Sequence, residues 1–123
     1  MTVDVILRAD AAIRFMQISD VPYKVVRGFQ KIKNLISEEA TIAHNRQVEI
    51  LEKQGGEVQD QAIVFPNVEK RLAYEREMDE LLKSEVDLEF EPLDLTQYVN
   101  EIKFRDVNAD VDALSAFILF EDE

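Results

Sequence analysis

Residues 21–56 read VPYKVVRGFQKIKNLISEEATIAHNRQVEILEKQGG. Apolar side chains recur in this stretch at spacings of three and four, the period of an amphipathic helix: Val25, Phe29, Ile32, Ile36, Ala40, Ala43, Ile50 and Leu51. The Gly55-Gly56 pair is typical of a helix end, because glycine readily adopts the left-handed backbone conformation found there. The stretch therefore predicts one long helix over about residues 21–54, roughly 45–50 Å in length.

Such a helix is longer than the core of a small protein can cover. The chain has 123 residues, of which 46% are hydrophobic and 33% charged, and this composition fits one folded domain over residues 1–123. Part of the long helix is therefore expected to project, to bend near Gly28, or to pack against another copy of the chain. We expect self-association.

The segment before the long helix predicts two short elements. Residues 3–7 form an apolar run, and residues 10–16 read as a short helix with Asp10 as its N-cap. Whether the two fuse into one helix stays open at this point. Ser19 or Asp20 is expected to cap the first N–H groups of the long helix.

Three elements are predicted after the glycine pair. Residues 62–65 are apolar and include two β-branched residues, which favours a short strand, and Asn67 is placed to cap a helix over residues 69–83. Residues 86–91 alternate strictly between apolar and acidic, as a strand with one buried and one solvated face does. This is the clearest strand signal in the chain.

The last part of the chain is less definite. Residues 96–104 fit either a short helix capped by Thr96 or another strand. Residues 110–118 predict a final helix with four side chains facing inward: Val111, Leu114, Phe117 and Ile118. Taken together, the elements predict an α+β fold dominated by helices, with one long helix, a small sheet and two shorter helices.

The reactive residue types do not form a catalytic or metal-binding pattern. There is no cysteine. The single histidine, His44, has only Gln47 and Val48 as possible partners one helical turn further on, so the sequence encodes neither a histidine-based catalytic triad nor a two-histidine metal site. None of the four serines lies in a sharp, glycine-flanked turn that presents a nucleophile. We therefore expect no enzyme activity, no catalytic residue, no metal and no cofactor.

The net charge of −12 is distributed unevenly along the chain. Residues 1–54 carry a net charge of +1 and residues 55–123 carry −13. A surface this negative repels nucleic-acid phosphates, so we expect a protein partner and no direct nucleic-acid binding. No run of about 18–20 apolar residues and no secretion signal is present, which favours a cytoplasmic protein without a membrane span.

An acidic face is the first candidate partner-binding surface. It consists of Asp87, Glu89 and Glu91 on one side of the predicted strand, with Asp94 just beyond. Carboxylates alone also suit Mg²⁺ or Ca²⁺, but the glycine-containing loop of a dedicated calcium site is absent. An ordinary solvated strand face is the third interpretation.

A basic stripe is the second candidate surface. Lys24, Arg27 and Lys31 are spaced three and four apart on the long helix, and no acidic residue lies between Val21 and Ser37. Cations near a helix N-terminus oppose the helix dipole, so a compensating anionic partner is expected. The acidic half of this chain or of a neighbouring copy could supply it, and a solvated helix face without a partner is the alternative.

Several short motifs in the chain resemble a known family. They are Val21-Pro22-Tyr23-Lys24, Gly55-Gly56, Phe65, residues 77–86 with Glu80-Leu81-Leu82-Lys83-Ser84-Glu85-Val86, and Pro92-Leu93-Asp94-Leu95. In this order they resemble a family of small proteins of unknown function encoded by tailed bacteriophages and their prophages. The resemblance implies a phage-encoded accessory protein in the bacterial cytoplasm or associated with the virion, and it implies no catalytic residues.

These observations lead to a hypothesis of action by contact rather than catalysis. The first version is a self-associating assembly or virion-related protein that docks on a phage or host protein. The alternatives are an inhibitor whose acidic surface imitates nucleic acid on a host or defence protein, and a sponge that binds a small anionic signal through the basic stripe. The sequence does not name the partner.

Overall fold

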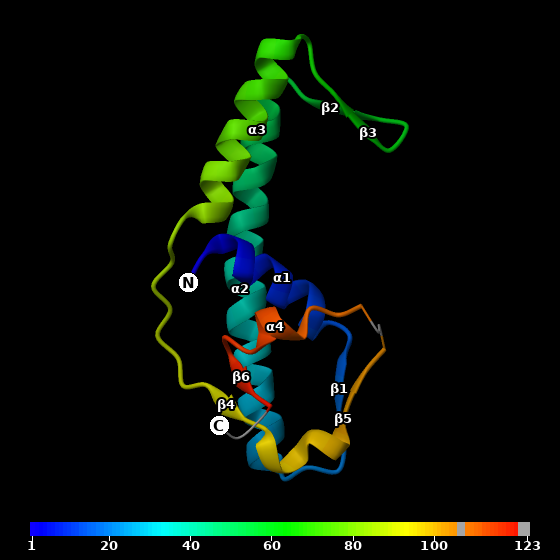
Figure 1. Cartoon of the computed structure of the whole chain (residues 1–123), viewed down its shortest axis with the longest axis vertical. Helices are drawn as coiled ribbons and strands as arrows, with labels where there is room; N and C mark the ends of the chain where they lie inside the picture. Colours follow the sequence, from blue (N-terminus) through cyan, green and yellow to red (C-terminus); the bar gives the residue numbers. More distant parts are fainter. Residues whose placement is uncertain (106–107, 121–123) are drawn as a thin grey trace.

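The long helix forms the spine of the protein. The computed structural model describes residues 1–105 and 108–120 (Figure 1). Helix α2 (Tyr23–Lys53) runs along most of the molecule, which confirms the predicted helix. Pro22 is its N-cap residue and no side chain caps the helix, so the expected capping by Ser19 or Asp20 is wrong. The chain enters instead through a turn in which Asp20 has a positive φ of 55°.

The glycine pair ends α2 as predicted. Gly55 has a φ of +69°, its N–H donates to the Glu52 carbonyl at 3.0 Å, and the Gly56 N–H donates to the Leu51 carbonyl at 2.9 Å. These two bonds satisfy carbonyl groups that a helix end otherwise leaves unpaired. At Gly56 a Cβ atom would also overlap the Leu51 side chain and lie 2.9 Å from Phe65. The pair therefore both stops the helix and turns the chain back.

Helix α1 (Val3–Ile13) joins the apolar run over residues 3–7 to the first part of the short helix predicted over residues 10–16, but it ends at Ile13, and Met16 already belongs to a strand. Thr2 is its N-cap and accepts from the Val5 N–H at 3.3 Å. The expectation that Asp10 caps a helix is therefore wrong. It lies inside the helix with its side chain buried, where it accepts from Arg14 at 2.7 Å.

The main core lies where α1 crosses the first half of α2. Its fully buried large side chains are Ile6 and Ile13 of α1, Ile36 of α2, and Leu95, Leu114, Phe117 and Ile118 from the last third of the chain. Each such side chain contributes about 1.5–3 kcal/mol by leaving water. The apolar stripe predicted for α2 is thus confirmed as its inward face.

Three two-stranded pairings supply the β-structure. Strand β1 (Met16–Ile18) pairs antiparallel with β5 (Ile102–Phe104), and β4 (Leu93–Asp94) pairs parallel with β6 (Ile118–Leu119). The third pairing is a hairpin, described below. The fold is α+β and helix-dominated, as predicted.

Residues 96–104 contain both alternatives, a short helix followed by a strand, but the expected capping by Thr96 is wrong, because Leu95 is the N-cap residue and no side-chain hydrogen bond caps this helix. A 3₁₀ helix, η1 (Thr96–Glu101), leads directly into β5. The prediction of a single helix over residues 110–118 is wrong. Helix α4 (Val111–Leu114) ends after one turn, and Val111 is exposed, whereas Leu114, Phe117 and Ile118 are buried as predicted.

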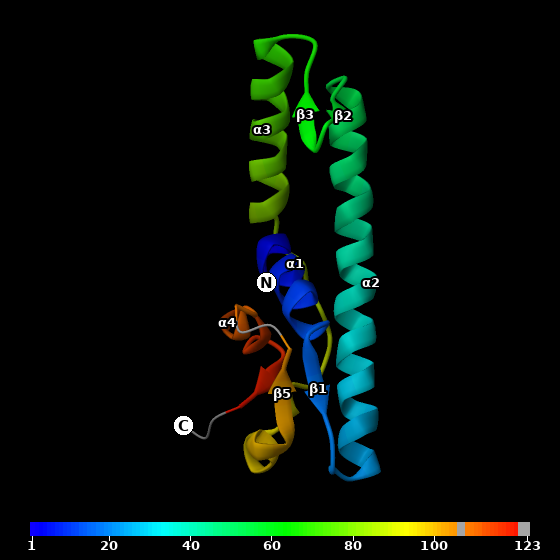
Figure 2. The same ribbon diagram turned by 90° about the vertical axis from the view of Figure 1, so that its right-hand side faces the viewer.

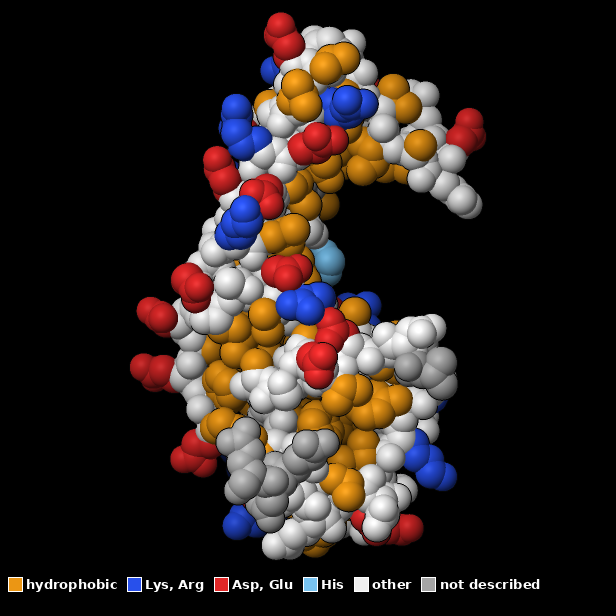
Figure 3. All heavy atoms as spheres, viewed as in Figure 1, with side chains coloured by type: hydrophobic (Ala, Val, Ile, Leu, Met, Phe, Trp, Pro, Cys, Tyr) orange, Lys and Arg blue, Asp and Glu red, His pale blue; other side chains and the backbone are white. Residues whose placement is uncertain are grey.

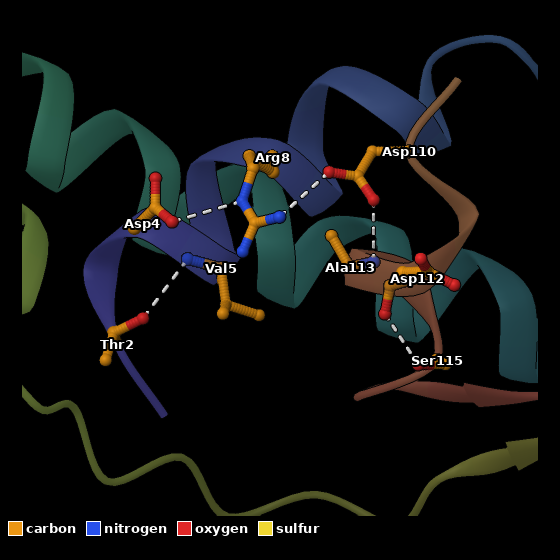
Figure 4. Close-up of polar contacts among 8 residues, drawn as sticks. All are labelled: Thr2, Asp4, Val5, Arg8, Asp110, Asp112, Ala113 and Ser115. Carbon is orange, nitrogen blue, oxygen red and sulfur yellow. Dashed lines mark hydrogen bonds and ion pairs between the residues drawn. The ribbon is translucent and has the colours of Figure 1, made fainter. Parts of the chain in front are cut away.

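An ion-pair cluster holds α4 against α1 (Figure 4). The Arg8 guanidinium lies 3.1 Å from both the Asp4 and the Asp110 carboxylates. Asp110 also caps α4 by accepting from the Ala113 N–H at 3.0 Å. This fixes the start of α4 beside α1 and lets the chain turn back toward β6.

The strand predicted over residues 86–91 is not formed. Val86, Leu88 and Phe90 are partly buried against the core and the acidic residues between them are exposed, so the alternation correctly marks the buried side. Its backbone pairing with the other described residues is limited to the hydrogen bond that the Val86 N–H donates to the Met1 carbonyl, next to a bridge between Thr2 and Glu85. Because no described strand lies beside it, the segment is irregular.

The distal part of the molecule is an arm that projects from this body (Figure 2). We define the arm as α2 from Ala43 onward, the hairpin of β2 (Glu57–Gln59) and β3 (Ala62–Val64), and α3 (Val68–Lys83). The strand and helix predicted here are confirmed, and Asn67 caps α3 by accepting from the Lys70 N–H at 2.8 Å. Strand β2 was not predicted.

Candidate protein interface

The two charged surfaces predicted from the sequence meet at one groove. It has a volume of about 860 Å³ and lies between the first half of α2 and the segment from Glu89 to Tyr98. Its apolar lining comes from both sides: Val25, Ile32 and Leu35 of α2, with Phe90, Pro92, Leu93 and Tyr98 opposite. Gly28 lies between them, and a Cβ there would be only 2.9 Å from the Leu93 side chain. A glycine at this position lets β4 approach the helix closely.

The walls of this groove carry opposite charges. Lys24, Arg27 and Lys31 line it from α2, and all three are exposed. On the other wall lie Glu89, Glu91 and Asp94, also exposed. Among the described residues, none of these six side chains has an ion-pair partner within 4.0 Å. These acidic residues of the chain thus lie across the groove from the basic stripe but form no ion pair with it.

Asp87 is the one predicted site residue outside this groove. It is exposed on the same segment as Glu89 and Glu91 but does not line the hollow. In Figure 3, acidic side chains form a row along the margin of the body that this segment follows. The four predicted acidic residues are therefore exposed, and Glu89, Glu91 and Asp94 line the groove.

Asp94 is held as a carboxylate by a local turn. The Thr96 backbone N–H donates to Asp94 Oδ1 at 3.0 Å, and the Thr96 hydroxyl donates to the same oxygen at 2.8 Å. These bonds lower the pKa of Asp94 below its ordinary value, because both favour the charged form. The acidic wall consequently keeps a fixed anion at the start of η1.

The arm presents a second unusual surface, which sequence analysis did not single out. Helix α3 has no buried residue, and every residue of β2 and β3 is exposed. Large apolar side chains remain in water there, with Val58 69% and Val68 61% exposed, together with Val48, Ile63, Val64 and Leu72. An accumulation of exposed apolar side chains in one part of a molecule is typical of contact surfaces.

Polar contacts join the two helices of the arm. Glu77 of α3 accepts from Lys53 at 2.9 Å and from Gln54 at 3.1 Å. The Lys53 hydrogen bond is the main reason that the pKa of Glu77 is lowered. The second carboxylate oxygen of Glu77, Oε2, is buried without a hydrogen-bond partner among the described residues, beside a small cavity of about 360 Å³. Sequence reasoning missed this contact, because Lys53 and Glu77 carry no local motif.

The described residues offer no arrangement for metal binding or membrane crossing. No group of three or more His, Asp or Glu side chains in residues 1–105 and 108–120 is placed to hold a metal ion. His44 is exposed, with its Nδ1 atom 3.0 Å from Gln47 Oε1. Within the same part of the chain, no helix is both long and apolar enough to span a bilayer.

Comparison of the chain with protein-family models, with curated proteins and with solved structures returns no match. The resemblance to small phage-encoded proteins therefore stays a prediction.

Proposed function

We propose that this chain is a small acidic accessory protein of the phage type that acts by protein–protein contact and self-associates. The observation that carries this proposal is the arm, in which a 16-residue helix buries none of its residues and an exposed hairpin displays β-branched side chains. A two-stranded hairpin alone is marginally stable in water, so it gains from being covered. A phage or host protein is the proposed partner of the arm.

The two alternatives have no specific observation in their favour. A nucleic-acid mimic needs a surface of one sign, whereas Glu89, Glu91 and Asp94 share their groove with three cations. A site for a small anion needs the cations without opposing carboxylates, and the same wall opposes it. Both alternatives weaken for the same electrostatic reason.

The experiment is affinity capture from phage-infected or prophage-bearing cells, followed by mass spectrometry and reconstitution of the captured pair from purified proteins. The variant V58S/I63S removes exposed apolar side chains from the arm and should weaken the reconstituted complex at least about tenfold. The matched control V99S/V111S removes exposed apolar side chains from the body and should leave binding unchanged. Equal binding by all three proteins would contradict docking through the arm.

A further inference from the structure

The groove beside α2 carries unpaired charges of both signs among the described residues. Three cations and three carboxylates line opposite walls of one hollow without forming ion pairs among the described residues. An occupant of one charge sign would be attracted by one wall and repelled by the other. The groove therefore selects an occupant that carries both signs in separate rows, with apolar groups between them.

A second copy of this chain has that pattern by construction. Two copies that face each other across a two-fold axis use the same patch twice. If the axis runs along the groove, the rotation places the basic wall of each copy opposite the acidic wall of the other. Each basic wall then faces an acidic wall of the other copy. A translation alone would not bring the two grooves face to face.

We propose that this groove is the contact between two copies of the chain, with Lys24, Arg27 and Lys31 of each copy facing Glu89, Glu91 and Asp94 of the other. The inference rests on the self-association in the proposed function and specifies its surface. Partly buried apolar side chains along the groove, such as Phe90, Leu93 and Tyr98, would lose their remaining water contact in the dimer. The arms stay free to bind a different protein.

Salt dependence alone does not test this dimer. Added salt weakens the cross-copy pairs, but it also screens the repulsion between two chains that each carry a net charge of −12. Substitutions that reverse the charge of one wall or of both walls avoid this ambiguity. Arg27 and Lys31 provide one pair of sites, and Glu89 and Glu91 provide the matching pair.

The experiment measures mass by sedimentation equilibrium for R27E/K31E and E89K/E91K, separately and mixed. Each variant alone should dimerise at least about a hundredfold more weakly than the wild type, because like charges meet in both halves of the contact. The mixture should recover a dimer made of one copy of each variant. The quadruple variant with both walls exchanged should again form a homodimer.

The controls separate this inference from the broader proposal. K70E/R76E makes the same charge change on exposed α3 residues and should leave the dimer intact, and circular dichroism checks that each variant is folded. A wild type that is monomeric up to high concentration would overturn self-association itself. A wild-type oligomer whose mass survives both wall variants, or a mixture that stays monomeric, would overturn the groove as the contact.

Discussion

The body and the arm are built on the same helix but use their apolar residues differently. In the body, Ile32 and Ile36 of α2 are buried under α1 and the last third of the chain. In the arm, Ile50 is buried, yet α3 covers the helix without burying any residue of its own. The body thus contains most of the apolar burial, and the arm retains apolar surface for contact. The same exposed apolar side chains that are proposed to bind a partner contribute little burial to the arm itself.

The largest expected effect is the difference in free energy of unfolding between a substitution in the core and one in the arm. Phe117 is fully buried, and its ring centroid lies 5.1 Å from that of Phe90. Phe117→Ala should lower the free energy of unfolding by about 3–5 kcal/mol, because it removes a large buried ring and leaves a cavity. Leu72→Ala, on the exposed face of α3, should change it by less than about 0.5 kcal/mol.

Denaturant unfolding followed by circular dichroism, at one fixed protein concentration, measures both values. A loss at Leu72 as large as that at Phe117 would mean that the arm is covered in solution, and the contrast between the two regions would no longer hold.

A smaller effect is expected at the end of α2. Gly55→Ala forces a side chain into a backbone conformation with φ of +69° and places Cβ about 3.0 Å from the Pro66 ring. This should cost about 1–2 kcal/mol, mostly as easier opening of the arm. Amide hydrogen exchange should accelerate in β2, β3 and α3 and stay unchanged in α1.

Gly55→Asn is the matched control, because asparagine tolerates the left-handed region better than alanine does. Faster exchange in α1 as well would contradict the independence of arm and body.

The cap of α3 should matter less and more locally. Asn67→Ala removes the side-chain oxygen that accepts from the Lys70 N–H and should cost about 1 kcal/mol of local helix stability. Exchange of the first amides of α3 reports the loss. Asn67→Asp keeps an acceptor at the same place and should show nearly wild-type exchange, whereas equal effects of both substitutions would refute capping as the cause.

The smallest effect is a pH dependence confined to the arm. The pKa of Glu77 is lowered below its ordinary value of 4.5, chiefly by the hydrogen bond from Lys53. A carboxyl group with a lowered pKa stabilises the folded state above its ordinary pKa, and this stabilisation disappears as the pH falls through the lowered value. Opening of the arm should therefore increase below about pH 4.5.

Amide exchange of α3 at several pH values, compared between the wild type and Glu77→Gln, isolates this contribution from the other carboxyl groups. The substituted protein should show a smaller increase in opening as the pH falls. An identical pH response in both proteins would remove Glu77 as its source.

Much of the helical part of this fold could be predicted because its signals are local. The spacing of apolar residues in α2, the glycine pair after it and Asn67 before α3 each act within a few residues of the chain. The candidate site was half predictable for the same reason. The basic stripe and the acidic face are each visible in a short stretch, but their meeting across one groove is not.

Where prediction failed, a distant partner decided the outcome. Residues 86–91 alternate as a strand should, but a strand also needs a neighbour, and none of the described residues forms one beside this segment. The reverse holds for β2, whose polar sequence gave little signal. It forms because Asp60 and Gln61 both adopt positive φ and turn β3 back onto it.

By itself the sequence determined the long helix, its end at the glycine pair, the regional acidity and the lack of a catalytic pattern. Only the tertiary structure decided that the chain, after α3, returns along α2 and places three carboxylates opposite three cations. The physical reason is that helix periodicity and capping depend on neighbours within about one turn. A groove depends on the packing of Gly28 against Leu93, which are far apart in the chain and are brought together by the folded core.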